Sequence, residues 1–217
     1  EAIDGMVNLQ MKVAVIVLDH SECAPVFQKH RIDYCCRGEL PLEQACAERG
    51  VAAASVLEEL NQEIASRTDR PEEDARTQPT AALIERIVRR HHRYLREALP
   101  FLVPLAKKVA RVHGAHNANL LDVRDAVEEL ADLLLPHLDR EEEVLFPALL
   151  RGRDDPGAAR VLAEELKAMH EDHTEVAKVL ERLRDAAHEF ALPEWACTSY
   201  TTLFRELQVL EGDVFKH

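Results

Sequence analysis

The sequence predicts an all-α protein in which an up-down four-helix bundle follows a small helical N-terminal domain. Composition gives the first indication, because 47% of the residues are hydrophobic and 31% are charged, while aromatic residues make up only 5%. This balance, with only 7 glycines, is typical of helix-rich proteins. The second indication is that apolar residues recur at helical spacing through four stretches, which are separated by segments rich in Gly, Pro, Asn and Asp.

Residues 1–66 are predicted to form the small helical domain. The run at 11–18, "MKVAVIVL", is too short for its periodicity to distinguish a buried strand from a helix. Ser21 is expected to cap a helix at its N-terminus, and a further helix is expected to end at Gly50. The stretch at 51–66 carries apolar residues at the spacing of one helical face, which predicts another helix.

A linker and the bundle are predicted to make up the rest of the chain. Residues 67–80 are polar and charged, contain two prolines and lack apolar periodicity, which predicts a linker. Residues 81–217 are predicted to form the bundle, because short connections between helices favour up-down packing. Pro100 and Pro104 are each expected to kink or end its first helix. The four predicted helices cover roughly residues 81–111, 119–146, 158–190 and 194–217.

One histidine falls on the apolar face of each bundle helix. Leucine or valine lies 3, 7 and 10 residues after both His92 and His173, whereas the same kind of stripe precedes His137 and His217. If consecutive helices are antiparallel, all four imidazoles face inward at the same end of the bundle. Four converging imidazoles predict a metal site, because without a metal each needs its own hydrogen-bond partner in an apolar core. The alternative is four ordinary core histidines, each bonded to a backbone group.

A carboxylate is predicted to join these histidines. Glu141 lies four residues after His137, so the two side chains project from the same helical face. Glu142 and Glu143 rotate off that face and are expected to be solvated. Mixed imidazole and carboxylate ligands in a helical bundle favour iron or manganese, and zinc is also compatible. Two neighbouring histidines are rival candidates as ligands: His91 and His170.

Charge and hydropathy exclude several classes of partner. The net charge of -13 argues against nucleic acid, whose phosphates would be repelled, and makes a metal cation a more natural ligand. The sequence contains neither an apolar run long enough to cross a bilayer nor a signal peptide, so we expect a cytoplasmic protein without membrane partners.

The five cysteines are expected to be reduced thiols, because an odd number is not typical of a secreted disulfide framework. Cys35 and Cys36 are adjacent, so they lack the spacing of a zinc knuckle, and a disulfide between neighbours would be strained. They are either reactive thiols or two small buried hydrophobic residues. Cys23 and Cys46 are expected to be structural, and Cys197 is left without a predicted role.

Four motifs together resemble one family from about residue 12 onward: "IDYCCRGELPLEQACAERG", "IVRRHHRYLREALP", "HLDREEEVLFP" and "MHEDHTEV". They are similar to the RIC proteins, the di-iron proteins for repair of iron centres. In that family an N-terminal domain of the ScdA type with a vicinal Cys-Cys precedes a hemerythrin-like four-helix bundle. The resemblance implies five metal ligands in this chain: His92, His137, Glu141, His173 and His217. It also implies a sixth ligand, a Glu after the last histidine, which would lie beyond His217.

Two departures from the family pattern stand out. The family usually reads Cys-Cys-Gly-Gly, whereas Arg37 replaces the first of those glycines. The third ligand motif is usually Glu-His-Asp, and in this chain Asp172 and Thr174 flank His173. The first departure bears on the turn after the thiols, and the second on the surroundings of one predicted ligand.

The resemblance implies a function in the repair of iron-sulfur clusters or iron centres damaged by nitrosative or oxidative stress. A carboxylate-bridged di-iron cofactor would donate iron to the damaged protein, or reduce nitric oxide as a nitric oxide reductase. Cys35 and Cys36 would receive iron, exchange electrons or react with a nitrosyl group. Expected partners are damaged iron proteins, nitric oxide or oxygen, and a second copy of the chain in a homodimer. Two alternatives are a hemerythrin-like carrier or sensor of oxygen or nitric oxide without repair activity, and a purely structural bundle.

Overall fold

The structure is a computed structural model that describes residues 7–34, 37–66, 77–152 and 155–217. Within these ranges every regular element is a helix, and the only β contact is an isolated bridge between Lys12 and Pro41. The all-α class predicted from composition is therefore confirmed. The chain separates into two compact units, one that ends at Pro79 and one that begins at Thr80.

The N-terminal unit packs short helices around a small core. The run at 11–18 lies largely in α1, so it forms a helix and not a strand. Gly50 ends α3 with φ 67°, the left-handed conformation that glycine adopts at helix ends without a steric cost. The core contains Ile16, Phe27 and Leu60, all fully buried. The helices are α1 (Val13–Asp19), η1 (Ser21–Cys23), α2 (Ala24–Lys29), α3 (Leu42–Arg49) and α4 (Ala53–Ser66).

The predicted cap at Ser21 is wrong. Ser21 is the first residue of η1, and neither η1 nor α2 begins with a side-chain cap hydrogen bond. A proline lies in the first turn of α2, where its missing N–H leaves one donor fewer to satisfy. The helix therefore begins without the cap that the sequence suggested.

The turn after the vicinal cysteines depends on Gly38. A Cβ added there would lie 2.4 Å from the carbonyl oxygen of Tyr34 and 2.5 Å from Cβ of Ala14, so only glycine fits. Arg37 pairs with Glu48 of α3 at 2.6 Å. The arginine in place of the family's glycine is therefore held by an ion pair to α3. The predicted thiols Cys35 and Cys36 lie outside the described residues.

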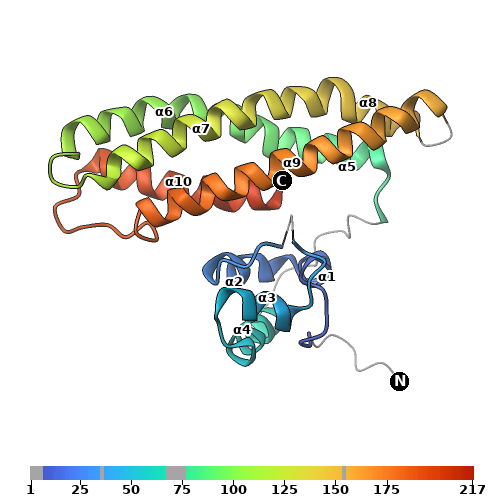
Figure 1. Cartoon of the computed structure of the whole chain (residues 1–217), viewed down its shortest axis with the longest axis horizontal. Helices are drawn as coiled ribbons and strands as arrows, with labels where there is room; N and C mark the ends of the chain where they lie inside the picture. Colours follow the sequence, from blue (N-terminus) through green and yellow to red (C-terminus); the bar gives the residue numbers. More distant parts are fainter. Residues whose placement is uncertain (1–6, 35–36, 67–76, 153–154) are drawn as a thin grey trace. The chain divides into compact units, whose positions relative to one another are not determined.

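The C-terminal unit is a bundle built from four long helical segments (Figure 1). The first runs through α5 (Thr80–Ile87), the π-helical turn η3 (Val88–His92) and α6 (Arg93–His113). The second runs through α7 (Asn119–Arg140), the π-helical turn η4 (Glu141–Leu145) and α8 (Phe146–Arg151). The third is α9 (Pro156–Ala186) and the fourth is α10 (Thr198–Lys216). The predicted four-helix bundle is confirmed.

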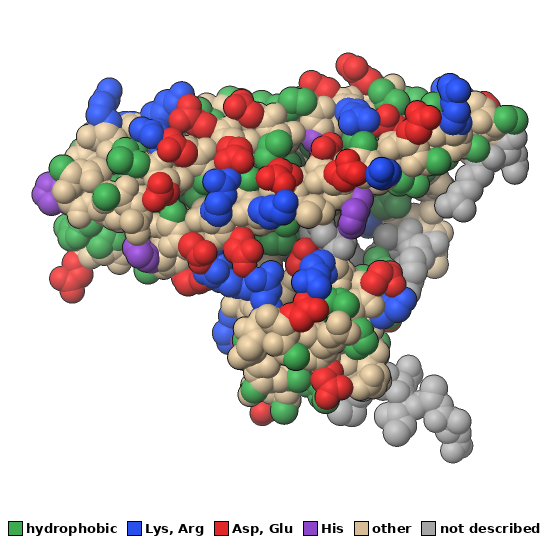
Figure 2. Space-filling model, viewed as in Figure 1, with side chains coloured by type: hydrophobic (Ala, Val, Ile, Leu, Met, Phe, Trp, Pro, Cys, Tyr) green, Lys and Arg blue, Asp and Glu red, His purple; other side chains and the backbone are tan. Residues whose placement is uncertain are grey.

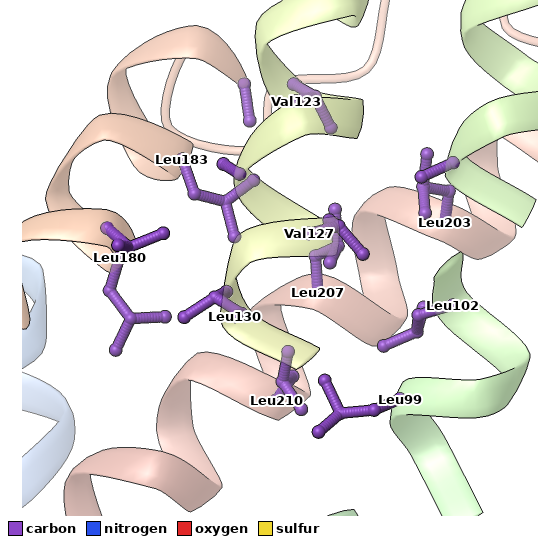
Figure 3. Packing of buried hydrophobic residues seen from close by; sticks show 14 of the residues in the cluster. Leu99, Leu102, Val123, Val127, Leu130, Leu180, Leu183, Leu203, Leu207 and Leu210 are labelled. Carbon is purple, nitrogen blue, oxygen red and sulfur yellow. The ribbon is translucent and has the colours of Figure 1, made fainter. Parts of the chain in front are cut away.

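The core of the bundle lies between these helices. In Figure 3 side chains from α6, α7, α9 and α10 point toward one another, among them Leu102, Leu130, Leu183 and Leu207. Each of these four leucines is fully buried. The face of the molecule drawn in Figure 2 is instead covered by charged side chains of both signs, interspersed with apolar ones. The apolar periodicity of the sequence therefore marks the inner faces of the helices.

Two prolines lie inside α6 without ending it, so of the two outcomes predicted, a kink or an end, the end is wrong. The helix continues from Arg93 to His113 through both Pro100 and Pro104. Both prolines lie on the exposed face, where water can bond the carbonyl groups that lose their helical partners. None of the described helices is long and apolar enough to cross a membrane.

Candidate metal centre

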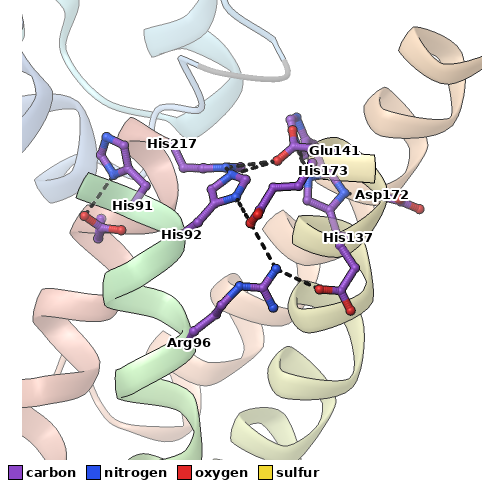
Figure 4. Close-up of polar contacts among 11 residues, drawn as sticks. His91, His92, Arg96, His137, Glu141, Asp172, His173 and His217 are labelled. Atoms are coloured by element: carbon purple, nitrogen blue, oxygen red, sulfur yellow. Dashed lines mark hydrogen bonds and ion pairs between the residues drawn. The ribbon is translucent and has the colours of Figure 1, made fainter. Parts of the chain in front are cut away.

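The five predicted ligands converge inside the bundle (Figure 4). Three are almost fully buried: His92, at the end of η3, is 1% exposed, His137 of α7 is 3% exposed and Glu141, the first residue of η4, is 6% exposed. His173 of α9 and His217, which follows α10, are partly buried. Ligand atoms of four of the five lie within 4.8 Å of one another, those of His137, Glu141, His173 and His217.

Two π-helical turns position the site. His92 is the last residue of one and Glu141 the first residue of the other. A π turn holds more residues than an α turn, so it shifts the side chains that follow around the helix axis. Such turns occur frequently at functional sites. Predictions based on the 3.6-residue period do not anticipate them, because the apolar stripes continue on either side.

The four imidazoles form two pairs. Nε2 of His92 lies 2.9 Å from Nε2 of His217, and Nε2 of His173 lies 3.1 Å from Nε2 of His137. Ring centroids are 5.0 and 4.8 Å apart within the pairs, but 6.0 Å apart between His137 and His217 and 6.3 Å between His173 and His217. Two nitrogens bound at about 2.1 Å to a common metal, about 90° apart, are separated by about 3 Å. The spacing within each pair therefore fits two ligands of one ion.

Glu141 lies between the two pairs. Its Oε2 is 3.1 Å from Nε2 of His92 and 3.2 Å from Nε2 of His217, while its Oε1 is 3.5 Å from Nε2 of His137. Oε2 is buried, and the imidazole nitrogens nearby do not give it a hydrogen bond of acceptable geometry. A buried carboxylate oxygen without a hydrogen bond is costly. A cation beside it would remove that cost, so the residues present fit a metal.

Two further carboxylates contact the outer nitrogens of the histidines. Oε1 of Glu142 lies 2.8 Å from Nδ1 of His92, and Oδ2 of Asp172 lies 3.2 Å from Nδ1 of His137. A carboxylate at Nδ1 favours the proton there and leaves Nε2 free to bind a metal. The prediction that Glu142 is merely solvated is wrong, because the π turn brings it back toward the bundle, whereas Glu143 is exposed. Arg96 also binds Glu142, at 3.0 Å.

The protonation states of Glu141 and His173 suit a cation. Burial alone would raise the pKa of Glu141, but the imidazoles of His137, His217 and His92 hold that pKa well below its usual range. Burial and two neighbouring imidazoles lower the pKa of His173 to about 4. At neutral pH the carboxylate is therefore charged and His173 is neutral, which are the forms that bind metals.

The rival histidines lie outside the five-residue group. His91 is buried, but its Nδ1 contacts Asp213 at 3.0 Å. His170 is exposed. His92 and His173, which have leucine or valine 3, 7 and 10 residues later, therefore join the group, whereas their neighbours do not. Sequence reasoning did not find the roles of Glu142 and Asp172, for which no periodic signal exists.

Comparisons with known proteins match two parts of the chain to two different family models. Residues 9–64 match the ScdA_N model, described as a domain of unknown function, and residues 83–217 match the hemerythrin HHE cation binding domain. The second match covers more than half of the chain and contains all five converging side chains.

Several curated relatives span almost the whole chain. The "Iron-sulfur cluster repair protein ScdA" of Staphylococcus haemolyticus is 28% identical over 215 residues, which cover 98% of this chain and 94% of that protein. The protein of the same name from Staphylococcus epidermidis is 28% identical over 220 residues, covering 98% and 94%. The "Iron-sulfur cluster repair protein YtfE" of Escherichia coli O17:K52:H18 is 28% identical over 203 residues, covering 93% and 88%. With an ScdA_N domain ahead of a hemerythrin bundle, the chain belongs to the hemerythrin HHE cation binding family and, within it, to the RIC proteins.

Proposed function

We propose that this chain is a di-iron protein that repairs iron-sulfur clusters or other iron centres damaged by nitrosative or oxidative stress. The relatives that match nearly its full length carry the name of iron-sulfur cluster repair proteins. The observation that carries the proposal is the arrangement of Glu141, whose two oxygens face different histidine pairs. A carboxylate in that position suits a bridge between two cations.

Each proposed ion has its own set of side chains. His92 and His217 would hold one ion with Oε2 of Glu141, and His137 and His173 would hold the other with Oε1. Imidazole and carboxylate ligands projecting into a helical bundle are typical of di-iron and di-manganese proteins. Iron is preferred because the named relatives act on iron-sulfur clusters.

The rest of the site supports these ligands. Bound iron would supply redox chemistry, a place for nitric oxide or oxygen to bind, and iron that can be passed to a damaged client. Glu142 and Asp172 orient His92 and His137 through their Nδ1 atoms. The net charge of -13 favours the approach of cations to the protein. Cys35 and Cys36 are proposed to receive iron or to react with a nitrosyl group at the client.

A repair assay tests this proposal. A separate protein whose [4Fe–4S] cluster has been damaged by nitric oxide is incubated with the iron-loaded chain, and recovery of cluster absorbance is followed. We expect recovery with the wild type and with Glu143→Gln, whose exposed side chain lies beside the site without contributing to it. Recovery should be lost in His173→Ala. No recovery by an iron-loaded wild type would overturn the proposal, and full recovery by Cys35→Ala/Cys36→Ala would remove the thiols from it.

A hemerythrin-like carrier or sensor is the second candidate, since the hemerythrin match and the converging ligands both lie in the bundle. Such a protein binds oxygen or nitric oxide reversibly and leaves it unchanged. Nitric oxide reduction would instead yield nitrous oxide, which gas chromatography detects. Reversible binding without either nitrous oxide or cluster recovery would favour the carrier.

A further inference from the structure

We propose that Cys197 and His113 form a thiol modification site in the bundle, separate from the metal centre, which takes small disulfides such as oxidised glutathione. Cys197 immediately precedes α10, whereas His217 follows it. The 19 residues of α10 rise by about 1.5 Å each, so the two ends are about 30 Å apart. The pair therefore has no part in holding the proposed iron.

The thiol and the imidazole come from different helices and are in contact. Sγ of Cys197 lies 3.1 Å from Nε2 of His113, the last residue of α6. Cys197 is free and exposed, so small molecules can reach its sulfur. The pair thus combines a nucleophile with a base at hydrogen-bond distance, which is the arrangement that activates cysteine.

Aromatic side chains hold the imidazole in place. The ring of His113 packs against Trp195 at a centroid distance of 5.7 Å and meets the edge of Tyr200 at 5.8 Å. Asn117 donates a hydrogen bond to the hydroxyl of Tyr200 at 3.3 Å. Because the histidine is packed on two sides, its Nε2 is kept toward the sulfur before any reagent arrives.

Positive charge lies near the sulfur of Cys197. Cys197 is the N-cap residue of α10, where the helix dipole is positive, and no acidic residue lies in the first turn. Lys108 of α6 binds the hydroxyl of Ser199 at 3.2 Å and adds a positive charge beside that turn. Two other titratable groups lie nearby: Glu194, three residues before the cysteine, and His116, which packs against Trp195.

The proposed reaction is thiol–disulfide exchange. His113 accepts the thiol proton of Cys197, and Sγ attacks one sulfur of the small disulfide. The disulfide bond breaks, a new bond forms between Sγ and the attacked sulfur, and the other half leaves as a thiolate that takes the proton. The other cysteines that the structure describes, Cys23 and Cys46, are buried, so neither is exposed to reverse the reaction.

The test measures how fast Cys197 of the full chain reacts with oxidised glutathione. Trypsin releases residues 185–205 as one peptide that contains a single cysteine, and mass spectrometry gives its modified fraction over time. An unassisted thiol with an ordinary pKa near 8.5 is only about 0.3% ionised at pH 6. We expect the wild type to retain at least about a tenth of its pH 9 rate at pH 6.

Two variants identify the base. His113→Asn should slow the reaction of Cys197 at pH 6 by about tenfold or more, and by much less at pH 9, where an unassisted thiol is mostly ionised. His116→Asn is the matched control, because it also packs against Trp195 but is not a described partner of the sulfur, and its rate should stay within twofold. Equal rates in the wild type and His113→Asn at pH 6 would overturn the proposal. If His113→Asn does not fold, a wild-type rate that falls about 200-fold from pH 9 to pH 6, as for an unassisted thiol, would overturn it as well.

Discussion

Replacing Glu142 by glutamine should weaken metal binding without changing any proposed ligand. The amide oxygen of Glu142→Gln can still accept a hydrogen bond from Nδ1 of His92, so the variant removes a charge and keeps the shape. Arg96 loses one ion pair but stays paired with Asp139 at 2.7 Å. The substitution therefore isolates the contribution of a negative charge behind His92.

The size of the effect follows from burial. The side chain of His92 is 1% exposed, so water cannot replace the carboxylate at its Nδ1. The side chain of Glu142 is 34% exposed, and solvent screens part of its charge. Loss of such an outer carboxylate costs about 10- to 100-fold in metal affinity, and the exposure places Glu142 near the lower end. We expect a dissociation constant about tenfold higher, which corresponds to about 1.4 kcal/mol.

The assay is a competition titration of ferrous iron against a chromophoric chelator under anaerobic conditions. Glu143→Gln serves as the control, because it removes the same charge from the neighbouring, exposed position. The control should bind within twofold of the wild type. Equal dissociation constants for Glu142→Gln and Glu143→Gln would refute the reasoning, since the contact with His92 would then have no effect.

Three further predictions concern the bundle, the second outer carboxylate and a buried thiol. Leu130→Ala should lower the free energy of unfolding by about 2–5 kcal/mol in urea titrations. Leu121→Ala, at a residue 42% exposed on the same helix, should change it by less than about 0.5 kcal/mol. Similar losses in the two variants would contradict the packing described. Asp172→Asn should raise the metal dissociation constant through His137, and an unchanged constant in the chelator titration would argue against that contact. Burial raises the pKa of Cys23 to about 12. The unfolded chain therefore loses this proton at a lower pH than the folded chain, and the folded chain loses stability between about pH 9 and 12. At pH 9, iodoacetamide should accordingly label Cys23 far more slowly in the folded chain than in the chain unfolded by urea. Equal labelling rates would contradict the burial of Cys23.

Much of the bundle could be predicted because its signal is periodic. Leu95, Leu99 and Leu102 repeat at helical spacing after His92, and all three are buried in the structure. The same regularity extends to His137, whose apolar stripe runs in the opposite direction. Helix periodicity therefore predicts both which residues form the core and at which end of the bundle the histidines lie.

Local features such as turns and helix ends were predicted less well, because they depend on single residues and not on a repeated pattern of apolar residues. The π turn at Glu141–Leu145 turns Glu142 toward His92, and nothing in the spacing of apolar residues reveals it. Pro100 and Pro104 stay within a helix because they face solvent, which depends on the completed bundle. The fourth helix begins at Thr198, later than the predicted 194, after a connection that contains three consecutive residues with positive φ. Outcomes of this kind depend on tertiary context that periodicity does not carry.

The central claim is that Glu141 joins two histidine pairs, each holding one iron ion. Metal analysis of iron-loaded protein after removal of free iron tests it most directly, with His173→Ala and Glu143→Gln measured beside the wild type. We predict about two iron atoms per chain for the wild type and Glu143→Gln, and about one for His173→Ala, whose other pair remains intact. A wild-type chain that retains one iron atom or none, or a His173→Ala variant that retains two, would contradict the account.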